Sequence, residues 1–161
     1  MRYLLVALLI GFAAGLRSLT PPAMVSWGAY LGWLQLLGSP FAFMASGIAV
    51  TIFSTLAVVE LIADKLPQTP SRTKPGPLMA RILMGAFAGA CLSAAGGNSV
   101  LAGVAVGGLG GLVGTFVGYE VRRRLVTELG VKDRVIAVLE DLVAIGLAYA
   151  LVRVVANSYE L

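Results

Sequence analysis

Histidine is absent from this chain of 161 residues, and cysteine occurs once, at Cys91. A chain without histidine cannot build a His-based catalytic triad, a histidine metal site or an imidazole proton switch. A single cysteine excludes an intrachain disulfide and a thiolate metal cluster. Acid–base or ion chemistry therefore falls to Asp, Glu, Lys, Arg, Tyr or backbone groups. No cofactor is expected, and the sequence leaves open whether a metal binds.

Charge is also scarce, because only 12% of the residues are charged whereas 58% are hydrophobic. The mean hydropathy is +0.91, and an ordinary soluble domain is about 25% charged. This composition excludes a soluble enzyme, a disordered chain and a nucleic-acid binder, despite the net charge of +4. The basic residues lie between apolar runs, as the positive-inside rule describes for membrane proteins. We therefore expect a lipid bilayer around the chain and no nucleic-acid partner.

Six apolar runs predict an all-α, polytopic membrane helical bundle that forms a single domain over residues 1–161. A membrane helix needs about 20 apolar residues, and about 17 suffice. One run is short and contains Trp27, Trp33 and Gln35, so five full spans plus one partial span remain an alternative. The runs cover residues 3–19, 23–37, 41–63, 78–95, 99–119 and 135–156, and the short run is the second.

Most of the basic residues fall into two clusters, which are predicted to share the cytoplasmic side. With six spans, both termini face the opposite side; if residues 23–37 do not cross, the N-terminus is cytoplasmic instead. The clusters hold nine of the twelve basic residues: Lys65, Arg72, Lys74 and Arg81, then Arg122, Arg123, Arg124, Lys132 and Arg134.

The two halves of the chain resemble each other. Residues 9–15 align with residues 83–89, and residues 58–60 align with residues 138–140. Three spans per half is an odd number, so the second half would insert upside down, as in many transporters. This predicts inverted three-helix repeats, residues 1–67 and 78–158, joined by loop 68–77. The alternative is that glycine-rich helices match by chance. The glycines of run 99–119 also predict close helix packing, either within the bundle or at a dimer interface.

Carboxylates interrupt the third and sixth runs, where a charge is costly and usually marks an ion path or proton relay. One interpretation is a pseudo-symmetric pair, Glu60 and Glu140, that binds a cation or passes a proton. The other is a structural salt bridge from either glutamate to Arg17 or Arg81. The candidate acids are Glu60, Asp64, Glu140 and Asp141.

Two polar segments add further candidates. A polar break between the first two runs contains Arg17, Ser18 and Thr20 and is followed by two prolines. This break either lines a binding site or is a plain tight loop. The loop after the third run carries Arg72, Thr73 and Lys74, with Arg81 following it. These groups suit a phosphate or lipid headgroup, or the loop is a stiff linker with topology charges.

Residues 14–23, AGLRSLTPPA, and residues 59–78, VELIADKLPQTPSRTKPGPL, resemble an uncharacterised bacterial integral-membrane family. Residues 118–124 and 139–141 fit it as well, so the resemblance covers nearly the whole chain. The family is a domain of unknown function. The resemblance implies a multi-pass protein of the bacterial inner (plasma) membrane and supplies no activity.

The first functional hypothesis is a small transporter or channel that moves a cation or a proton-coupled small solute past Glu60 and Glu140. The alternative is a non-catalytic membrane scaffold or lipid-headgroup binder that uses the loop at Arg72. An enzyme is least favoured, because no nucleophile–base pair stands out. A polar cavity reaching Glu60 would favour transport, and glutamates sealed in salt bridges would favour the alternative. Since so short a chain encloses little space, we expect a homodimer or a larger homo-oligomer.

Overall fold

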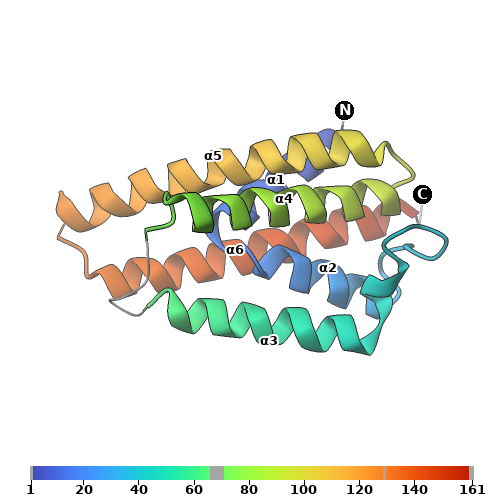
Figure 1. Cartoon of the computed structure of the whole chain (residues 1–161), viewed down its shortest axis with the longest axis horizontal. Coiled ribbons are helices and arrows are strands. Elements are labelled where there is room, and N and C mark those ends of the chain that lie inside the picture. The colour runs from blue at the N-terminus through green and yellow to red at the C-terminus, as the bar shows by residue number, and fades with distance from the viewer. Residues whose placement is uncertain (1, 66–70, 129, 160–161) are drawn as a thin grey trace.

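The computed structural model describes residues 2–65, 71–128 and 130–159. Within these residues the chain forms six α-helices, two short 3-10 turns and no strand (Figure 1). This confirms the predicted all-α bundle. The helices are α1 (Arg2–Leu16), α2 (Thr20–Tyr30), α3 (Gly47–Ala63), α4 (Pro75–Ala95), α5 (Val100–Thr127) and α6 (Asp133–Ala156), and the turns are η1 (Ala42–Ala45) and η2 (Asn157–Tyr159).

Three helices of the described chain are long and apolar enough to cross a membrane. They are α4, α5 and α6, with 21, 28 and 24 residues. The helices α1 and α3 are shorter but apolar, with 15 and 17 residues. A run of about 20 apolar residues spans the hydrocarbon core. The chain is therefore a helical membrane protein.

The first two helices form a hairpin that reaches only the middle of the bundle. In Figure 1, α1 runs inward from the N-terminus, and α2 returns toward the same end. The first run was expected to continue to Leu19, but α1 ends at Leu16. Pro21 and Pro22 lie in the first turn of α2 rather than outside it, because proline needs no amide partner there. With 11 residues, α2 is about 16 Å long, which is too short to cross the hydrocarbon core.

The two basic clusters lie at one end of the bundle, as the charge pattern predicts. The α3–α4 and α5–α6 connections share this end, which we call the basic end, and both termini lie toward the other (Figure 1). A cytoplasmic N-terminus was expected if the second run failed to cross. In the structure, α1 runs from the end opposite the basic end to the middle of the bundle and α2 turns back, so the N-terminus lies away from the basic end (Figure 1).

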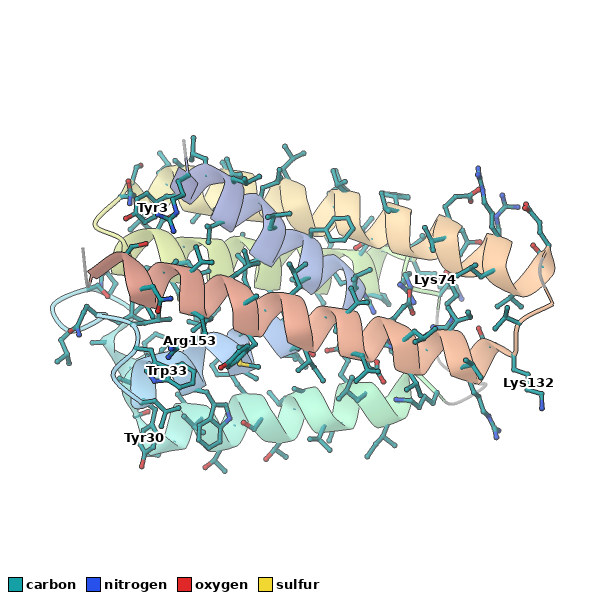
Figure 2. The ribbon with its side chains drawn as sticks, turned by 180° about the vertical axis from the view of Figure 1, so that it is seen from behind. Tyr3, Tyr30, Trp33, Lys74, Lys132 and Arg153 are labelled. Carbon is teal, nitrogen blue, oxygen red and sulfur yellow. The ribbon has the colours of Figure 1, made fainter. Side chains whose placement is uncertain are left out.

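Aromatic side chains gather at the opposite end. Figure 2 shows Tyr3, Tyr30 and Trp33 there, with Lys74 and Lys132 at the basic end. The guanidinium of Arg153 lies 4.8 Å from the centroid of the Trp33 ring, a cation–π contact. Tyrosine and tryptophan favour the membrane–water interface. The two ends of the bundle therefore differ as the two faces of a membrane protein do.

Glycines bring α1, α4 and α5 into close contact. A Cβ atom at Gly11 of α1 would overlap the carbonyl of Gly107, and one at Gly85 of α4 would lie 2.7 Å from the same oxygen. A Cβ atom at Gly15 would lie 2.5 Å from the Thr115 nitrogen of α5. Small residues let helix backbones approach in this way. These glycines therefore pack the interior of one chain.

The inverted repeat stays a prediction. The helix directions in Figure 1 suit it, since α1, α2 and α3 each run opposite to α4, α5 and α6 respectively. The matched glycines Gly11 and Gly85 also meet α5 at one point, Gly107. However, α2 has 11 residues and its counterpart α5 has 28, so the two halves are unequal.

Candidate functional site: a buried ion cluster beside an open basic pocket

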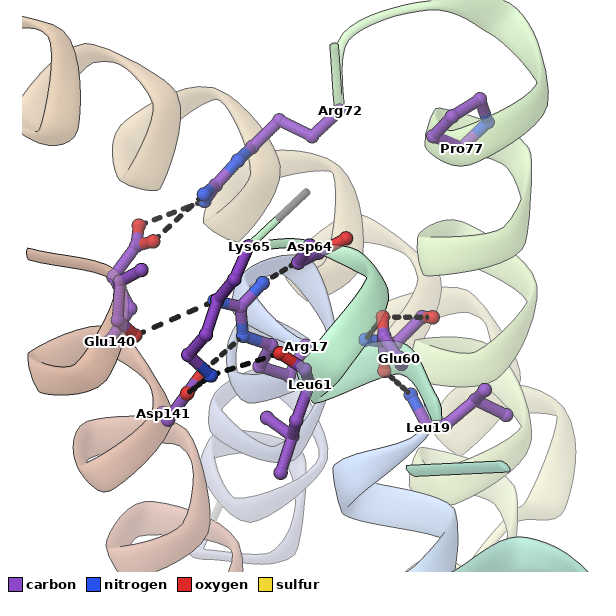
Figure 3. A network of polar contacts seen from close by, with 12 residues as sticks. Arg17, Leu19, Glu60, Leu61, Asp64, Lys65, Arg72, Pro77, Glu140 and Asp141 are labelled. Carbon is purple, nitrogen blue, oxygen red and sulfur yellow. Dashed lines mark hydrogen bonds and ion pairs between the residues drawn. The ribbon is translucent and has the colours of Figure 1, made fainter. Parts of the chain in front are cut away.

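The break between α1 and α2 places Arg17 inside the protein. Its side chain is fully buried, with 0% of its surface exposed. It donates to Asp64, at the end of α3, and its Nε lies 2.6 Å from Oδ1 of Asp141 on α6. Arg17 thus joins three separate segments of the chain (Figure 3). A buried charge needs such partners, because the apolar interior does not solvate it.

Further cations complete this cluster. The Nζ atom of Lys65 lies 2.6 Å from Oδ2 of Asp141, and Nη2 of Arg81 lies 3.4 Å from Oδ2 of Asp64. Each aspartate therefore contacts two cations. Arg81 also donates to the Gly15 carbonyl at 3.2 Å, one of the last carbonyls of α1, which a helix end leaves without an intrahelical partner.

Glu60 of α3 caps the start of α2. Its carboxylate accepts from the Ser18 amide at 2.7 Å, the Ser18 hydroxyl at 2.6 Å and the Leu19 amide at 2.8 Å. The N-cap residue, Leu19, has no side-chain acceptor of its own. A carboxylate from another helix therefore supplies the negative charge that a helix N-terminus favours. Arg81 lies 4.0 Å from the same carboxylate.

Glu140 has a different set of partners. It accepts two hydrogen bonds from Arg72, at 2.9 and 2.8 Å, and one from Arg122 at 3.2 Å. Arg122 also donates twice to Asp133, both at 2.7 Å. Figure 3 shows Glu60 and Glu140 on opposite sides of Arg17. The two glutamates are therefore held by different groups, Glu60 by amides and Glu140 by arginines.

The remaining candidate residues divide between interior and surface. Thr20 is buried, and its hydroxyl has no hydrogen-bond partner within the described chain. Thr73 lies 3.0 Å from the Ser71 hydroxyl, and Lys74 is exposed at the N-cap of α4. The structure thus brings Arg72 and Arg81 to carboxylates and leaves Lys74 at the surface. In the described part, no group of three or more His, Cys, Asp or Glu side chains is arranged to hold a metal ion.

An open pocket of about 680 Å³ lies at the basic end; we call it the basic pocket. Its wall includes Asp64, Lys65 and Arg81 of the buried cluster, but not Glu60. Among the described residues, seven cationic side chains and two carboxylates line it: Lys65, Arg72, Arg81, Arg122, Arg123, Lys132 and Arg134, with Asp64 and Asp133.

The sequence candidates did not include six residues that belong to the ion cluster or the basic pocket: Lys65, Arg122, Arg123, Lys132, Asp133 and Arg134. Arg122 was interpreted only as a topology charge, and Asp133 was not singled out. A spacing signal existed for Asp133, because Asp133 and Glu140 are seven residues apart and so share a helix face. Arg122 had no such signal, since its contacts with both acids depend on how α5 lies against α6.

Residues 4–155 match the model of a family described as a domain of unknown function, DUF4126. The chain belongs to this family. The match extends from α1 to α6 and therefore includes the Arg17 cluster and the basic pocket. A search of curated proteins and a search of solved structures each found no match. Membership of DUF4126 confirms the resemblance seen in the sequence and names no activity.

Proposed function

We propose that this DUF4126 protein is a small transporter or channel whose solute path passes the ion cluster around Arg17. One observation carries the proposal: a helix breaks inside the bundle, and the fully buried Arg17 at the break is held by carboxylates from two other segments. Many transporters build their sites from broken helices. Ionisable groups inside a membrane are costly, and they usually serve a function.

The pairing of the carboxylates favours one form of transport. Asp64 and Asp141 each already contact two cations, so a bare cation would have to displace an arginine or a lysine. Protonation of Asp141 would weaken its hold on Arg17 and Lys65 without any added ligand. The arrangement therefore supports movement of a proton-coupled small solute over passage of a free cation.

Helix α3 supplies the element that could move. It packs chiefly on α2 and η1. Its C-terminal end is joined to the rest of the bundle through Glu60, Asp64 and Lys65. A change in the charge of these groups would release that end of α3. This supports a cycle in which protonation loosens α3 beside the broken helix.

Reconstitution in liposomes tests the proposal. With a pH gradient across the membrane, wild type should show solute-dependent proton flux, followed with an internal pH dye. Asp141→Asn should abolish the flux while the protein stays folded. Glu128→Gln is the matched control, because Glu128 is exposed at the end of α5 and does not line the basic pocket, so it should leave the flux unchanged. Folded wild type with no flux for any cation, anion or neutral solute would contradict transport.

A second candidate function has its own supporting observation. Glu60 and Glu140 are both sealed by hydrogen bonds or ion pairs, and the basic pocket does not include Glu60. This favours a non-catalytic scaffold or a lipid-headgroup binder. Under this function, Glu60→Gln and Glu140→Gln would lower the unfolding temperature, and no variant would affect flux, because wild type would have none.

The proposal also includes a cellular setting. We place the protein in the bacterial inner membrane with its basic end in the cytoplasm, which the positive-inside rule supports. We also propose a homodimer or larger homo-oligomer. Exposed apolar residues on α3 and α6, such as Ile48 at 74% and Leu142 at 62%, offer surface for lipid or for a second copy. Native mass spectrometry of the detergent-solubilised protein gives the oligomeric state.

A further inference from the structure

We propose that the basic pocket binds a phosphomonoester or diphosphate group. The pocket lies between the end of α5 and the start of α6, and its floor contains groups of the Arg17 cluster. Its wall carries five more cationic side chains than carboxylates. A phosphomonoester brings close to two negative charges and three acceptor oxygens at neutral pH. The charge of the wall therefore suits a dianion and disfavours a metal cation.

Five of the seven cations already pair with carboxylates: Lys65 with Asp141, Arg72 and Arg122 with Glu140, Arg81 with Asp64, and Arg123 with Glu120. Asp133 accepts two hydrogen bonds from Arg122, and Asp64 pairs with Arg17 and Arg81. Lys132 and Arg134 lie exposed at the rim, and neither has an ion pair within the described chain. An entering anion therefore meets two cations, Lys132 and Arg134, that no carboxylate of the described chain compensates.

Two buried arginines provide oriented donors at the inner wall. Arg72 is 8% exposed and Arg81 is 5% exposed. Arg72 donates two hydrogen bonds to Glu140, which leaves three of its five N–H groups for a ligand. A guanidinium held in this way binds phosphate oxygens in pairs, and shielding from water strengthens each bond. Tyr119 and Ser71 add hydroxyl groups to the same wall.

The size of the pocket argues for a phosphate attached to a larger group. Its volume of about 680 Å³ lies within the range of sites that hold small organic ligands, roughly 300–1,000 Å³. A single phosphate ion would leave most of that volume empty. The group therefore belongs either to a soluble phosphorylated molecule or to a lipid headgroup of the adjacent leaflet. Both share the chemistry that the pocket recognises.

This inference deepens the proposed function. The claim that the phosphorylated molecule is the transported substrate rests on the proposed transport, whereas its binding to the pocket does not. Asp64, Lys65 and Arg81 belong both to the pocket wall and to the buried cluster. An anion that drew Lys65 and Arg81 toward itself would weaken their pairs with Asp141 and Asp64. Binding would thus act on the same contacts that hold the end of α3.

The test uses the full chain in phosphatidylcholine nanodiscs. Inorganic pyrophosphate is titrated by calorimetry, and a second preparation contains phosphatidic acid, whose retention is read by native mass spectrometry. Wild type should bind at least one of these probes. The double variant Lys132→Gln/Arg134→Gln should raise Kd roughly tenfold or more, because two charge-assisted contacts are lost. Arg124→Gln is the control, since Arg124 is exposed, pairs with Glu120 and does not line the pocket.

Each outcome decides the inference. Pyrophosphate binding alone identifies a soluble ligand class, and phosphatidic acid binding alone identifies a lipid headgroup. No binding of either probe by folded wild type would overturn the inference. So would an equal loss in the Arg124→Gln control, which would show unspecific attraction to charge. Binding without flux would contradict the proposed transport and support the phosphate-binding site. Flux without binding would contradict the phosphate-binding site alone.

Discussion

Arg17 shows how single residues hold this bundle together. Its guanidinium is completely buried, and it joins the α1–α2 break to Asp64 and Asp141. Removing one member of a buried ion pair leaves the other charge without compensation, which costs more than the pair itself contributes. Arg17 is therefore the residue whose loss should disturb the most contacts at once.

We expect Arg17→Gln to lower the free energy of unfolding by about 3–5 kcal/mol, because it leaves buried aspartates with one cation fewer. Thermal unfolding in detergent, followed by circular dichroism, measures the change. Arg2→Gln is the control, since Arg2 is exposed at the start of α1 and should leave the midpoint unchanged. An unaltered midpoint in Arg17→Gln would show that the cluster does not stabilise the fold.

Glu60 contributes through hydrogen bonds to amides. In Glu60→Gln, the new amide nitrogen would face a donor from Ser18 or Leu19, so one buried group would lose its partner. We expect a loss of about 1–3 kcal/mol, the usual cost of an unsatisfied buried group. Chemical unfolding in detergent measures it, and the same variant in liposomes reports flux. Unchanged stability with lost flux would assign Glu60 to transport rather than to capping.

At the scale of helices, α5 acts as the packing partner of both α1 and α4. Its glycines lie where backbones of neighbouring helices approach most closely. This explains why a helix of 28 residues carries so many residues of low helix propensity, since each glycine is destabilising for an isolated helix. Close contact with two neighbouring helices offsets that cost.

We expect Gly107→Ala to destabilise the bundle strongly, because its methyl group would meet the Gly85 carbonyl and lie 3.1 Å from the Gly89 Cα. Gly146→Ala in α6 is the matched control. A Cβ there would have no neighbour within 4 Å, so the better helix propensity of alanine should leave stability equal or raised by up to about 1 kcal/mol. Thermal unfolding compares the two. Equal midpoints would contradict the close packing of α5.

For the whole molecule, the hairpin of α1 and α2 leaves the N-terminus away from the basic end (Figure 1). Hydropathy alone favoured either two crossings or one, and the structure shows two short helices of 15 and 11 residues in their place. Both termini therefore lie toward the same end of the bundle (Figure 1). The position of the two basic clusters then determines the orientation in the membrane.

Single-cysteine labelling checks this orientation in a Cys91→Ala background, where the native thiol is buried. Ser71→Cys and Thr127→Cys lie at the basic end and should react with a membrane-impermeant reagent only from the cytoplasmic side. Asn98→Cys, in the turn between α4 and α5, should react only from the other side. Labelling of Ser71→Cys and Thr127→Cys from opposite sides would contradict the topology.

The membrane class, the number of helices and the shared side of the basic clusters could be predicted from the sequence by itself. Hydropathy and charge are local properties of a segment. A run of apolar residues therefore already predicts a segment in lipid, and a cluster of arginines predicts one at the membrane surface. The acids that interrupt the apolar runs could be located for the same reason. The partial second span was left open, and the early end of α1 was missed, because Pro21 suits a helix start as well as a stop.

Only the tertiary structure decided which charges meet. Arg72 pairs with Glu140 across 68 positions, and Arg17 pairs with Asp141 across 124. No periodicity specifies such partners, because they depend on which helices lie side by side in the bundle. The basic pocket has the same origin, since its wall forms only where the end of α5, the start of α6 and the segment before α4 converge.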